Sequence, residues 1–455
     1  MIRAPRPEDL APGSAPARRA LRYADARARV LGAVSVLPAE TVALGAALGR
    51  ALREAIRAPH DLPPFPNSSM DGFAVRAADL ASASAAHPVE LPVTAVVAAG
   101  ALPERPLGRG EAWRIMTGAP IPDGADAVVP LEDVDAIEPE PGRSRAPAGA
   151  RDTAAGTASP AGAPAGSRVR FTRVPAARAN IREAGADLSA GDPVLAAGRE
   201  LSAHDLGLLA ALGVARISVG VRPAAAILST GDELLDVDAP LRPGAIRDSN
   251  TLVLRLLLEQ AGCRVSLAER LPDDPARVAD RIRHAFAAAD VTLTIGGVSM
   301  GDFDPVRQAI AELKGVEWWR VAMKPGQPQA FGAPGGRLYF GLPGNPASVA
   351  CVFEALVRPA VRALQGFATL DRPKLTVRAA SAIESRAART DFVRATLEQR
   401  DGAWWASPAG AQASGHLTPQ SRAHALLVIP EGAAGLAAGE EAEAWLLRWP
   451  WPEGA

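Results

Sequence analysis

Three apolar runs in the second half of the chain each end in a polar, turn-rich segment. They read AAAILSTGDEL at residues 224–234, DVTLTIGGVSMGDFDP at 290–305 and RLYFGLPGNPASVACVFEALV at 337–357. Each run begins with β-type residues, continues with Gly, Asp, Asn or Pro, and then takes on helical spacing. Open parallel sheets bind ligands beyond the carboxyl ends of their strands. The pattern therefore predicts three strand-end loops that build one ligand site.

The hydrophobic pattern elsewhere divides the chain into shorter segments. Residues 23–37 have helical spacing, and residues 41–48 could begin a second helix. Short β-like runs separated by turns, from FAVR to DAVVPLEDV, indicate a small β-domain. Helical and strand patterns alternate from residue 201 to about 365, and strand-like runs return after Pro373.

The predicted fold class is α/β plus β: a multidomain chain in which small β-domains flank a central α/β domain with a parallel-type sheet. A chain of 455 residues is too long for one typical core. Residues 138–167 are nearly all Ala, Gly, Pro, Ser and Arg, which predicts a disordered insertion. The predicted parts are a disordered tail (1–20), a segment pair (21–66 and 170–200), a small β-domain containing the insertion (67–169), the α/β domain (201–367) and a C-terminal β-domain (368–455).

The charge balance and the cysteine content narrow the class of protein. Lys and Arg number 49 against 50 Asp and Glu, which argues against a nucleic-acid or anionic-membrane partner. Cys263 and Cys351 have no metal-ligand spacing, and free thiols fit a reducing cytoplasm. The N-terminal residues contain no apolar signal segment, and no apolar run is long enough to span a bilayer. We therefore expect a cytoplasmic protein.

Each strand-end loop carries residues that suit an anionic ligand or a cation. In the third loop, Asn345 and Pro346 are typical first residues of a helix, whose N-terminus attracts anions. The alternative for this loop is plain capping. In the second loop Asp304 would cap the next helix, while Asp302 is either solvated or a ligand of Mg²⁺. In the first loop, Asp232 or the preceding threonine could cap a helix.

Further candidates follow from position next to these turns. Capping explains one of the four polar residues at 247–250, which precede a helical segment. We predict ligand contacts at Gly231, Asp248, Ser249, Asn250, Gly296, Gly297, Ser299, Pro343, Gly344, Asn345 and Pro346, and a metal site at Asp232, Asp302 and Asp304.

Two cations and one turn complete the chemistry that the residues suggest. Arg320 and Lys324 are four apart in a strand-like segment, which puts both on one face, where they could bind phosphate or another oxyanion. The alternative is a solvated basic edge. Asp71-Gly72 is typical of a plain hairpin turn. The chain has neither GxxxxGK[ST] nor GxGxxG, so a P-loop or Rossmann nucleotide site is disfavoured.

Seven motifs in order make the chain resemble a known family. They are NSSMDGFAV, IMTGAPIPDGADAV, STGDEL, IRDSN, GGVSMGDFD, MKPGQP and GLPGNPAS. This order is similar to that of the molybdopterin molybdenumtransferases, the MoeA-type enzymes, to which the C-terminal domain of gephyrin is related. The resemblance runs from about Tyr23 to Pro430 and is interrupted by residues 138–167.

The resemblance implies an elongated, four-domain homodimer with a MogA-like α/β domain, in which 21–66 and 170–200 form a dimerisation or linker domain. It implies Mg²⁺-dependent insertion of molybdate into adenylated molybdopterin with release of AMP. It also implies site roles for Asp71, Thr117, Asp232, Asp304, Arg320, Lys324, Pro343, Pro346, Arg389 and Ser414.

Three departures from the family pattern are visible. Ala186 stands where a glutamate is usual, Arg320 replaces a lysine, and Gln327 replaces the second lysine of KPGKP. Two alternatives remain at this point: a molybdopterin adenylyltransferase, which shares the α/β domain, and a non-catalytic gephyrin-like scaffold. Molybdopterin adenylyltransferase and molybdoenzymes are the partner proteins that the resemblance suggests.

Overall fold

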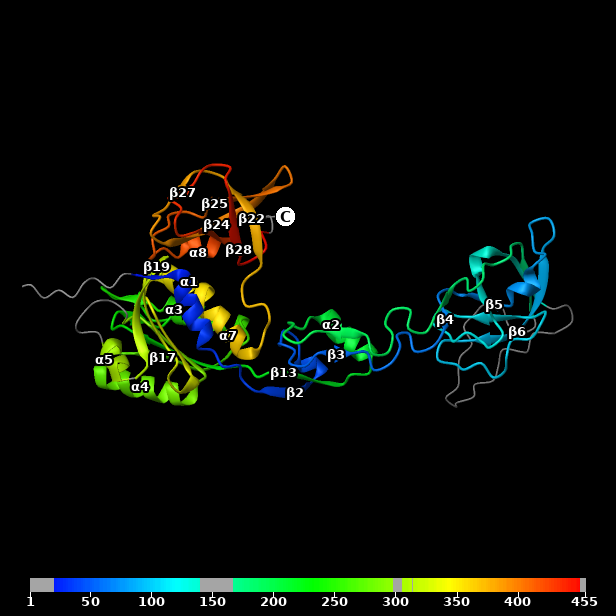
Figure 1. Cartoon of the computed structure of the whole chain (residues 1–455), viewed down its shortest axis with the longest axis horizontal. Coiled ribbons are helices and arrows are strands. Elements are labelled where there is room, and N and C mark those ends of the chain that lie inside the picture. The colour runs from blue at the N-terminus through cyan, green and yellow to red at the C-terminus, as the bar shows by residue number, and fades with distance from the viewer. Residues whose placement is uncertain (1–19, 140–166, 298–304, 313, 451–455) are drawn as a thin grey trace, which may run out of the picture. The chain divides into compact units, whose positions relative to one another are not determined.

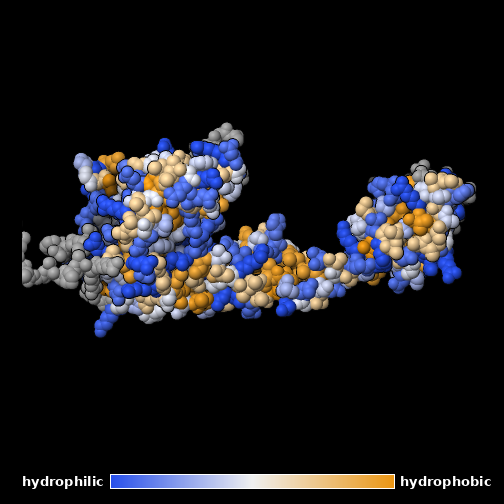
Figure 2. Space-filling view, turned by 45° about the horizontal axis from the view of Figure 1, so that its top comes forward, coloured by the Kyte–Doolittle hydropathy of each residue, from blue (hydrophilic) through white to orange (hydrophobic). Residues whose placement is uncertain are grey.

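The computed structural model describes residues 20–139, 167–297, 305–312 and 314–450 (Figure 1). The described residues form two compact units. The α/β unit contains Met1–Glu54, Ala196–Gly207 and Val214–Ala455, and the β unit contains Ala55–Leu195 and Leu208–Gly213. No helix in the described part of the chain is both long and apolar enough to cross a membrane. Polar and apolar side chains are interspersed on the face that Figure 2 shows.

The β unit is built on a six-stranded sheet. In spatial order its strands are β8 (Ala127–Pro130), β5 (Gly72–Val75), β7 (Ala112–Ile115), β6 (Val89–Val97), β10 (Ser167–Phe171) and β9 (Val134–Pro139). Alternate residues of β5 point to opposite faces: Phe73 and Val75 pack in one core, and Ala74 packs in another. Both faces of this sheet are therefore covered.

The insertion predicted from composition begins and ends inside strands. Pro139 of β9 pairs with Ser167 of β10, and Glu138 pairs with Arg168. The strands thus include residues 138, 139 and 167 of the predicted insertion, because backbone pairing does not need large side chains. Residues 140–166 lie outside the described residues, as do the predicted tail residues 1–19.

The predicted second helix at residues 41–48 is wrong. Residues Ala39–Ala43 form strand β2, which pairs antiparallel with β13 (Arg216–Gly220), and only a 3₁₀ turn follows at Leu44–Ala46. The sequence-distant partner β13 satisfies the backbone of the β-branched pair Thr41 and Val42. The first predicted helix is correct in position, but α1 (Tyr23–Gly32) ends earlier than residue 37.

The α/β unit contains a mixed sheet whose core strands are parallel. The order is β17 (Arg264–Leu271), β14 (Ala224–Thr230), β18 (Val291–Ile295), β21 (Leu338–Leu342), β20 (Pro328–Gly332) and β19 (Val316–Lys324). The first four are parallel neighbours, β20 is antiparallel to β21, and β19 is antiparallel to β20. Hence β14, β18, β21 and β19 all end at one edge of the sheet, called here the carboxyl edge.

Helices cover both faces of this sheet (Figure 1). Ala225 and Ile227 of β14 pack with α1, α3 (Ser249–Gln260), α6 (Pro346–Val352) and α7 (Arg358–Gln365), while a π-helical turn at Phe353–Val357 joins α6 to α7. Ala226 and Leu228 pack on the other face with α4 (Pro275–Ala288) and α5 (Pro305–Glu312). A strand buried on both faces explains the continuous apolar run at 224–228.

The C-terminal strands close into a five-stranded barrel. Its order is β24 (Thr390–Arg400), β25 (Ala403–Pro408), β22 (Lys374–Ala379), β28 (Glu441–Leu446) and β26 (Ala425–Ile429), and β26 pairs again with β24. β24 also runs parallel to β19, with Lys324 beside Asp391. Because β24 begins where β19 ends, the barrel (orange to red in Figure 1) extends beyond the carboxyl edge.

The remaining elements are short. They are β1 (Leu21–Arg22), β3 (Ile56–Arg57), β4 (Asn67–Ser68), η3 (Ala77–Leu80), η4 (Leu131–Asp133), β11 (Ile181–Arg182), β12 (Pro193–Leu195), α2 (Ala203–Ala211), β15 (Leu234–Leu235), β16 (Ile246–Arg247), η5 (Pro334–Gly336), β23 (Ile383–Glu384), α8 (Thr418–Arg422) and β27 (Gly435–Leu436).

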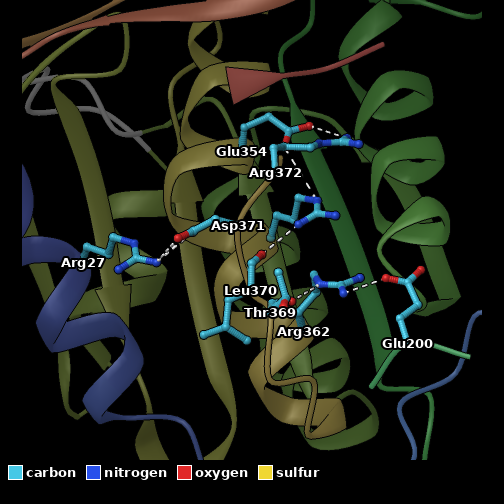
Figure 3. A network of polar contacts seen from close by, with 9 residues as sticks. Arg27, Glu200, Glu354, Arg362, Thr369, Leu370, Asp371 and Arg372 are labelled. Atoms are coloured by element: carbon cyan, nitrogen blue, oxygen red, sulfur yellow. Dashed lines mark hydrogen bonds and ion pairs between the residues drawn. The ribbon is translucent and has the colours of Figure 1, made fainter. Parts of the chain in front are cut away.

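Arginine side chains hold the connection between α7 and the barrel, which we call the linker network (Figure 3). Four successive residues of this connection each take part in a guanidinium contact. In order, Thr369 O accepts from Arg362 Nε (2.9 Å), Leu370 O accepts from Arg358 Nη1 (2.7 Å), Asp371 Oδ1 accepts from Arg27 Nη2 (2.7 Å) and Arg372 Nε donates to Glu354 Oε2 (2.9 Å).

Candidate functional site

The three strand-end loops meet at the carboxyl edge. A β-carbon placed on Gly296 would lie 3.2 Å from the Thr230 carbonyl oxygen, so the loops after β14 and β18 are in contact. One placed on Gly344 would lie 3.9 Å from Gly296 Cα, which brings in the loop after β21. Gly296 has φ +86°, a conformation that favours glycine. This convergence is what the strand-end pattern predicts.

The first loop does not lead into a helix, as the sequence pattern had predicted. After β14 the chain forms β15, which pairs with β16, and helix α3 begins only at Ser249. Pro240 and Pro243 lie between β15 and β16 and interrupt the helical spacing there, because a proline cannot continue a helix. Neither Thr230 nor Asp232 therefore caps a helix.

Asp248 is the cap of α3, and its carboxylate also ties the helix to the sheet. Its Oδ1 accepts from Thr251 N at 3.0 Å, and its Oδ2 accepts from Thr251 Oγ1 at 2.6 Å and from Ser229 Oγ at 2.8 Å. Asn250 Nδ2 donates to Gly344 O at 2.7 Å, which joins the start of α3 to the third loop. Capping and bridging therefore account for two of the polar residues predicted to contact a ligand.

The Asp232 carboxylate, in the first loop, has one hydrogen bond among the described residues and is otherwise open to solvent. The side chain is exposed, and its Oδ1 accepts only from Asp273 N at 3.3 Å; the main-chain oxygen accepts from Arg242. In the described part of the chain Asp232 forms no ion pair. The other predicted metal ligands, Asp302 and Asp304, and the predicted contact Ser299 lie outside the described residues.

The described residues contain no group of three or more His, Cys, Asp or Glu side chains placed to hold a metal ion. The predicted metal site therefore stays a prediction. Gly231, at the base of the first loop, has φ +145°, and a β-carbon there would lie 2.5 Å from the Glu233 carboxylate. Gly297 follows Gly296 with φ +71°.

The third loop begins α6 as predicted, but its free N–H groups are already used. Asn345 occupies the N-cap position without a side-chain capping bond. Pro346 has no N–H, Ala347 N donates to Ser414 O at 3.0 Å, and Ser348 N and Val349 N donate to Asn345 O. The N–H groups of Ala347, Ser348 and Val349 are therefore paired within the protein. Pro343 is buried, while Gly344 and Asn345 are exposed.

Arg320 and Lys324 are both exposed on β19, while Val321 and Met323 between them are buried. In the described part of the chain neither cation has an ion pair or a side-chain hydrogen bond. Four residues of a strand span about 13 Å, so the two charges do not require a shared anion. Lys324 ends β19 at the carboxyl edge, whereas Arg320 lies four residues before it. Lys324 is therefore the better placed of the two for an anion at this edge.

The barrel brings Arg389 and Ser414 to the same edge, with different contacts. Arg389 Nε donates to Asp391 Oδ1 at 2.6 Å, and the Asp391 carboxylate is nearly buried, so the charge of Arg389 is neutralised by the protein. Ser414 contacts the third loop through its carbonyl oxygen, the acceptor for Ala347 N. The resemblance did not anticipate the ion pair, because it identifies residues but not their partners.

Sequence reasoning missed Arg394, which is 1% exposed. Its Nε donates to Gln412 Oε1 at 3.2 Å and its Nη1 to Ala413 O at 3.3 Å, next to Ser414. Burial lowers the pKa of this guanidinium. An arginine inside the apolar run of β24 was the available signal, because a buried charge in a strand needs dedicated partners.

In the β unit, Asp71 and Thr117 come together. Asp71 Oδ1 accepts from Thr117 N at 2.7 Å and from Thr117 Oγ1 at 2.8 Å, and these bonds lower the pKa of the carboxyl. The expected plain hairpin is wrong, since Gly72 opens β5, which pairs with β7 and β8. Gly72 is required there, because a β-carbon would lie 2.1 Å from Val129 O.

Glu183, the acidic residue near Ala186, does not take the place of the glutamate that is usual at position 186. Glu183 is engaged by Arg178, with Oε1 accepting from Nε at 2.6 Å and Oε2 from Nη2 at 2.5 Å. Hydrogen bonds from Arg178 lower the pKa of Glu183. The Glu183 carboxylate is therefore committed to a local ion pair in the β unit.

Comparison with known families places the chain in a class of multidomain molybdenum-cofactor proteins. Three family models match it in order: the MoeA N-terminal region, domains I and II (residues 21–213), a probable molybdopterin binding domain (226–363) and the MoeA C-terminal region, domain IV (376–447). These matches account for the β unit, the α/β sheet and the barrel.

Individual relatives agree over nearly the whole chain. The chain is 36% identical over 411 residues to molybdopterin molybdenumtransferase 2 of Mycobacterium tuberculosis, covering 89% of this chain and 94% of the relative. It is 34% identical over 424 residues to the molybdopterin molybdenumtransferase of Bacillus subtilis, covering 90% and 92%. A crystal structure of the MoeA protein from Pyrococcus horikosii matches with a TM-score of 0.74 and 30% identity, covering 95% of this chain and 100% of that one. The chain belongs to the molybdopterin molybdenumtransferase (MoeA) family.

Proposed function

We propose that this protein inserts molybdate into adenylated molybdopterin and releases AMP, as a transferase of molybdenum-cofactor biosynthesis. The observation that carries the proposal is the carboxyl edge. There the three strand-end loops converge, Lys324 ends β19 without a counter-ion among the described residues, and the barrel supplies Ser414. The match of the central region to a molybdopterin-binding model supports the same edge as the substrate site.

The charges at this edge suit the reaction. Molybdate is a dianion and the dithiolene of molybdopterin is negative, so their approach needs positive charge nearby. Lys324 would offset this repulsion, and Arg320 would add a more distant positive charge. Release of AMP needs orientation and charge neutralisation rather than a covalent nucleophile.

Among the described residues, the Asp232 carboxylate would supply one ligand to a divalent cation. The carboxylate is exposed and receives one long main-chain hydrogen bond, which leaves oxygen lone pairs free, and oxygen ligands suit Mg²⁺. Asp232 would hold the cation together with Asp302 and Asp304. Mg²⁺, when bound, would supply neutralising charge to the phosphate of the substrate. Asp71 and Thr117, a hydrogen-bonded pair within the β unit, remain proposed site residues.

We further propose that the protein works as a cytoplasmic homodimer. Leu252 and Leu256 are four residues apart on α3, which places them on one helix face, and they are 49% and 48% exposed. Such apolar exposure supports a protein interface. Sedimentation would measure the assembly.

An adenylyltransferase is not favoured, because both flanking regions also match MoeA models.

The test is AMP release by the purified protein from adenylated molybdopterin, molybdate and limiting Mg²⁺. Asp232→Asn keeps the side-chain shape and removes the charge, and we expect it to slow release by about tenfold to a hundredfold. Asp236→Asn in the same loop is the matched control, since Asp236 makes a surface ion pair with Arg270 at 3.2 Å. Equal rates for the two variants would contradict the role of Asp232. No release by the unaltered protein would contradict the function.

A further inference from the structure

A buried glutamine holds the loop that carries Lys324. Gln329, in β20, is 3% exposed, and its Nε2 donates to Gly326 O at 2.6 Å and contacts Met323 Sδ at 3.1 Å. Pairing between β19 and β20 ends where Arg320 faces Pro328, although β19 continues to Lys324, so residues 325–327 connect the two strands. The Gln329 side chain therefore reaches back into the connection that begins at the edge cation.

The same connection is wedged against the helix of the third loop. Gly326 has φ +104°, and a β-carbon there would lie 2.4 Å from Val352 Cγ2 of α6. Val321 N donates to Gln327 O at 2.8 Å, which closes the connection on its other side. The backbone around Lys324 is thus fixed by contacts that involve neither its own side chain nor a ligand.

We propose that Gln329 is the positioning residue for Lys324, and through it for the anionic substrate. The inference rests on the proposed function. Because the Lys324 ammonium has no partner in the described part of the chain, its position depends on the backbone that carries it. Removing the Gln329 donor leaves the Gly326 carbonyl without its side-chain donor, and an unsatisfied buried polar group drives local rearrangement. The rearranged connection would move Lys324 relative to the three loops.

A double-mutant cycle separates positioning from mere support of the fold. The variants are Gln329→Met, which keeps side-chain length, Lys324→Ala, and both together. Molybdate affinity is measured directly by calorimetry, and the molybdate dependence of AMP release is measured alongside it. We expect Lys324→Ala and Gln329→Met each to weaken molybdate binding by about tenfold, and the double variant to bind molybdate no more weakly than Lys324→Ala.

A second buried glutamine provides the matched control. Gln365 is 1% exposed, and its Nε2 donates to Ala261 O at 2.8 Å and Val361 O at 2.9 Å, at the far end of α7. Gln365→Met should lower the thermal midpoint as Gln329→Met does, but leave molybdate affinity unchanged. If Gln329→Met does not fold, Gln329→Asn, which is too short to reach Gly326, replaces it.

Three results would overturn the inference. One is an unchanged molybdate affinity in Gln329→Met. Another is a further tenfold loss when Gln329→Met is added to Lys324→Ala, which would mean that the two side chains act independently. The third is an equal loss of affinity in Gln365→Met. Failure of the proposed function is separate: without AMP release, the calorimetric cycle still decides whether Gln329 positions Lys324 for an oxyanion.

Discussion

The linker network and the carboxyl edge use the same residue types in opposite ways. In the linker network, three successive residues accept hydrogen bonds from arginines and the fourth, Arg372, pairs with Glu354 at 2.8 Å; Arg358 lies 3.8 Å from the same carboxylate (Figure 3). At the carboxyl edge, Lys324 and Asp232 have no ion pair within the described residues. A charge that the protein itself satisfies holds the fold, whereas a charge left open is free to meet a ligand.

Burial explains why the linker network must be fully paired. The side chain of Glu354 is 3% exposed, and burial together with Arg372 and Arg362 lowers the pKa of Arg358 to about 10. Such a cluster adds little net stability over apolar packing, but losing one member leaves an uncompensated charge. At the exposed carboxyl edge, water solvates an unpaired charge, so a charged side chain there needs no partner of opposite charge.

The largest effect is expected from removing the central carboxylate of the linker network. Glu354→Gln keeps the size of the side chain and leaves Arg372 without a counter-charge, so we expect a loss of about 3–5 kcal/mol in the free energy of unfolding, measured with denaturant. Glu259→Gln, in the surface pair with Arg255 at 3.1 Å, is the control and should cost at most about 0.5 kcal/mol. Changed molybdate affinity in folded Glu354→Gln would break the comparison.

An intermediate effect is expected at Arg389, which the resemblance places in the site and the structure places in an ion pair. Arg389→Met should lower the free energy of unfolding by about 1.5–3 kcal/mol, because the nearly buried Asp391 carboxylate loses charged hydrogen bonds. Molybdate affinity should change less than about twofold, that is, by less than about 0.5 kcal/mol.

Adding Asp391→Asn to Arg389→Met should restore part of the lost stability, because the unpaired carboxylate is gone. A tenfold weaker molybdate affinity in Arg389→Met, measured by calorimetry, would instead place Arg389 among the open charges of the carboxyl edge. The comparison would then need a third kind of residue, paired in the free protein and released by substrate.

The smallest effect on stability is expected from deleting residues 140–166, which are remote in sequence from the linker network and the carboxyl edge. Deleting residues 140–166 and joining Pro139 to Ser167 through Asn-Gly should leave the thermal midpoint of the protein undiminished. The two residues face each other across β9 and β10, and Asn-Gly suits a two-residue hairpin turn. Loop length changes stability by only about 0.6 kcal/mol per doubling. A midpoint lowered by more than about 4 °C would show that the deleted residues support the sheet.

Prediction from the sequence succeeded where local pattern and global fold agree. The apolar runs of β14, β18 and β21 are continuous because those strands are buried on both faces, and their polar ends share one edge because parallel strands do. Residues 41–48 were misassigned because the antiparallel partner that makes them a strand lies at 216–220. Arg394 escaped notice because its acceptors at 411–413 are loop residues without a pattern of their own.

The sequence by itself determined the strands of the central sheet, the edge at which the loops meet and, through its ordered motifs, the family. Only the tertiary structure decided which polar groups remain open. In the sequence, the acid Asp248 looks like Asp232, and the cation Arg389 looks like Lys324. In the structure, however, Asp248 accepts a hydrogen bond from Thr251, and Arg389 pairs with Asp391. Whether a charge is satisfied depends on distances between side chains and on burial, and these are fixed only when strands and loops remote in sequence pack together.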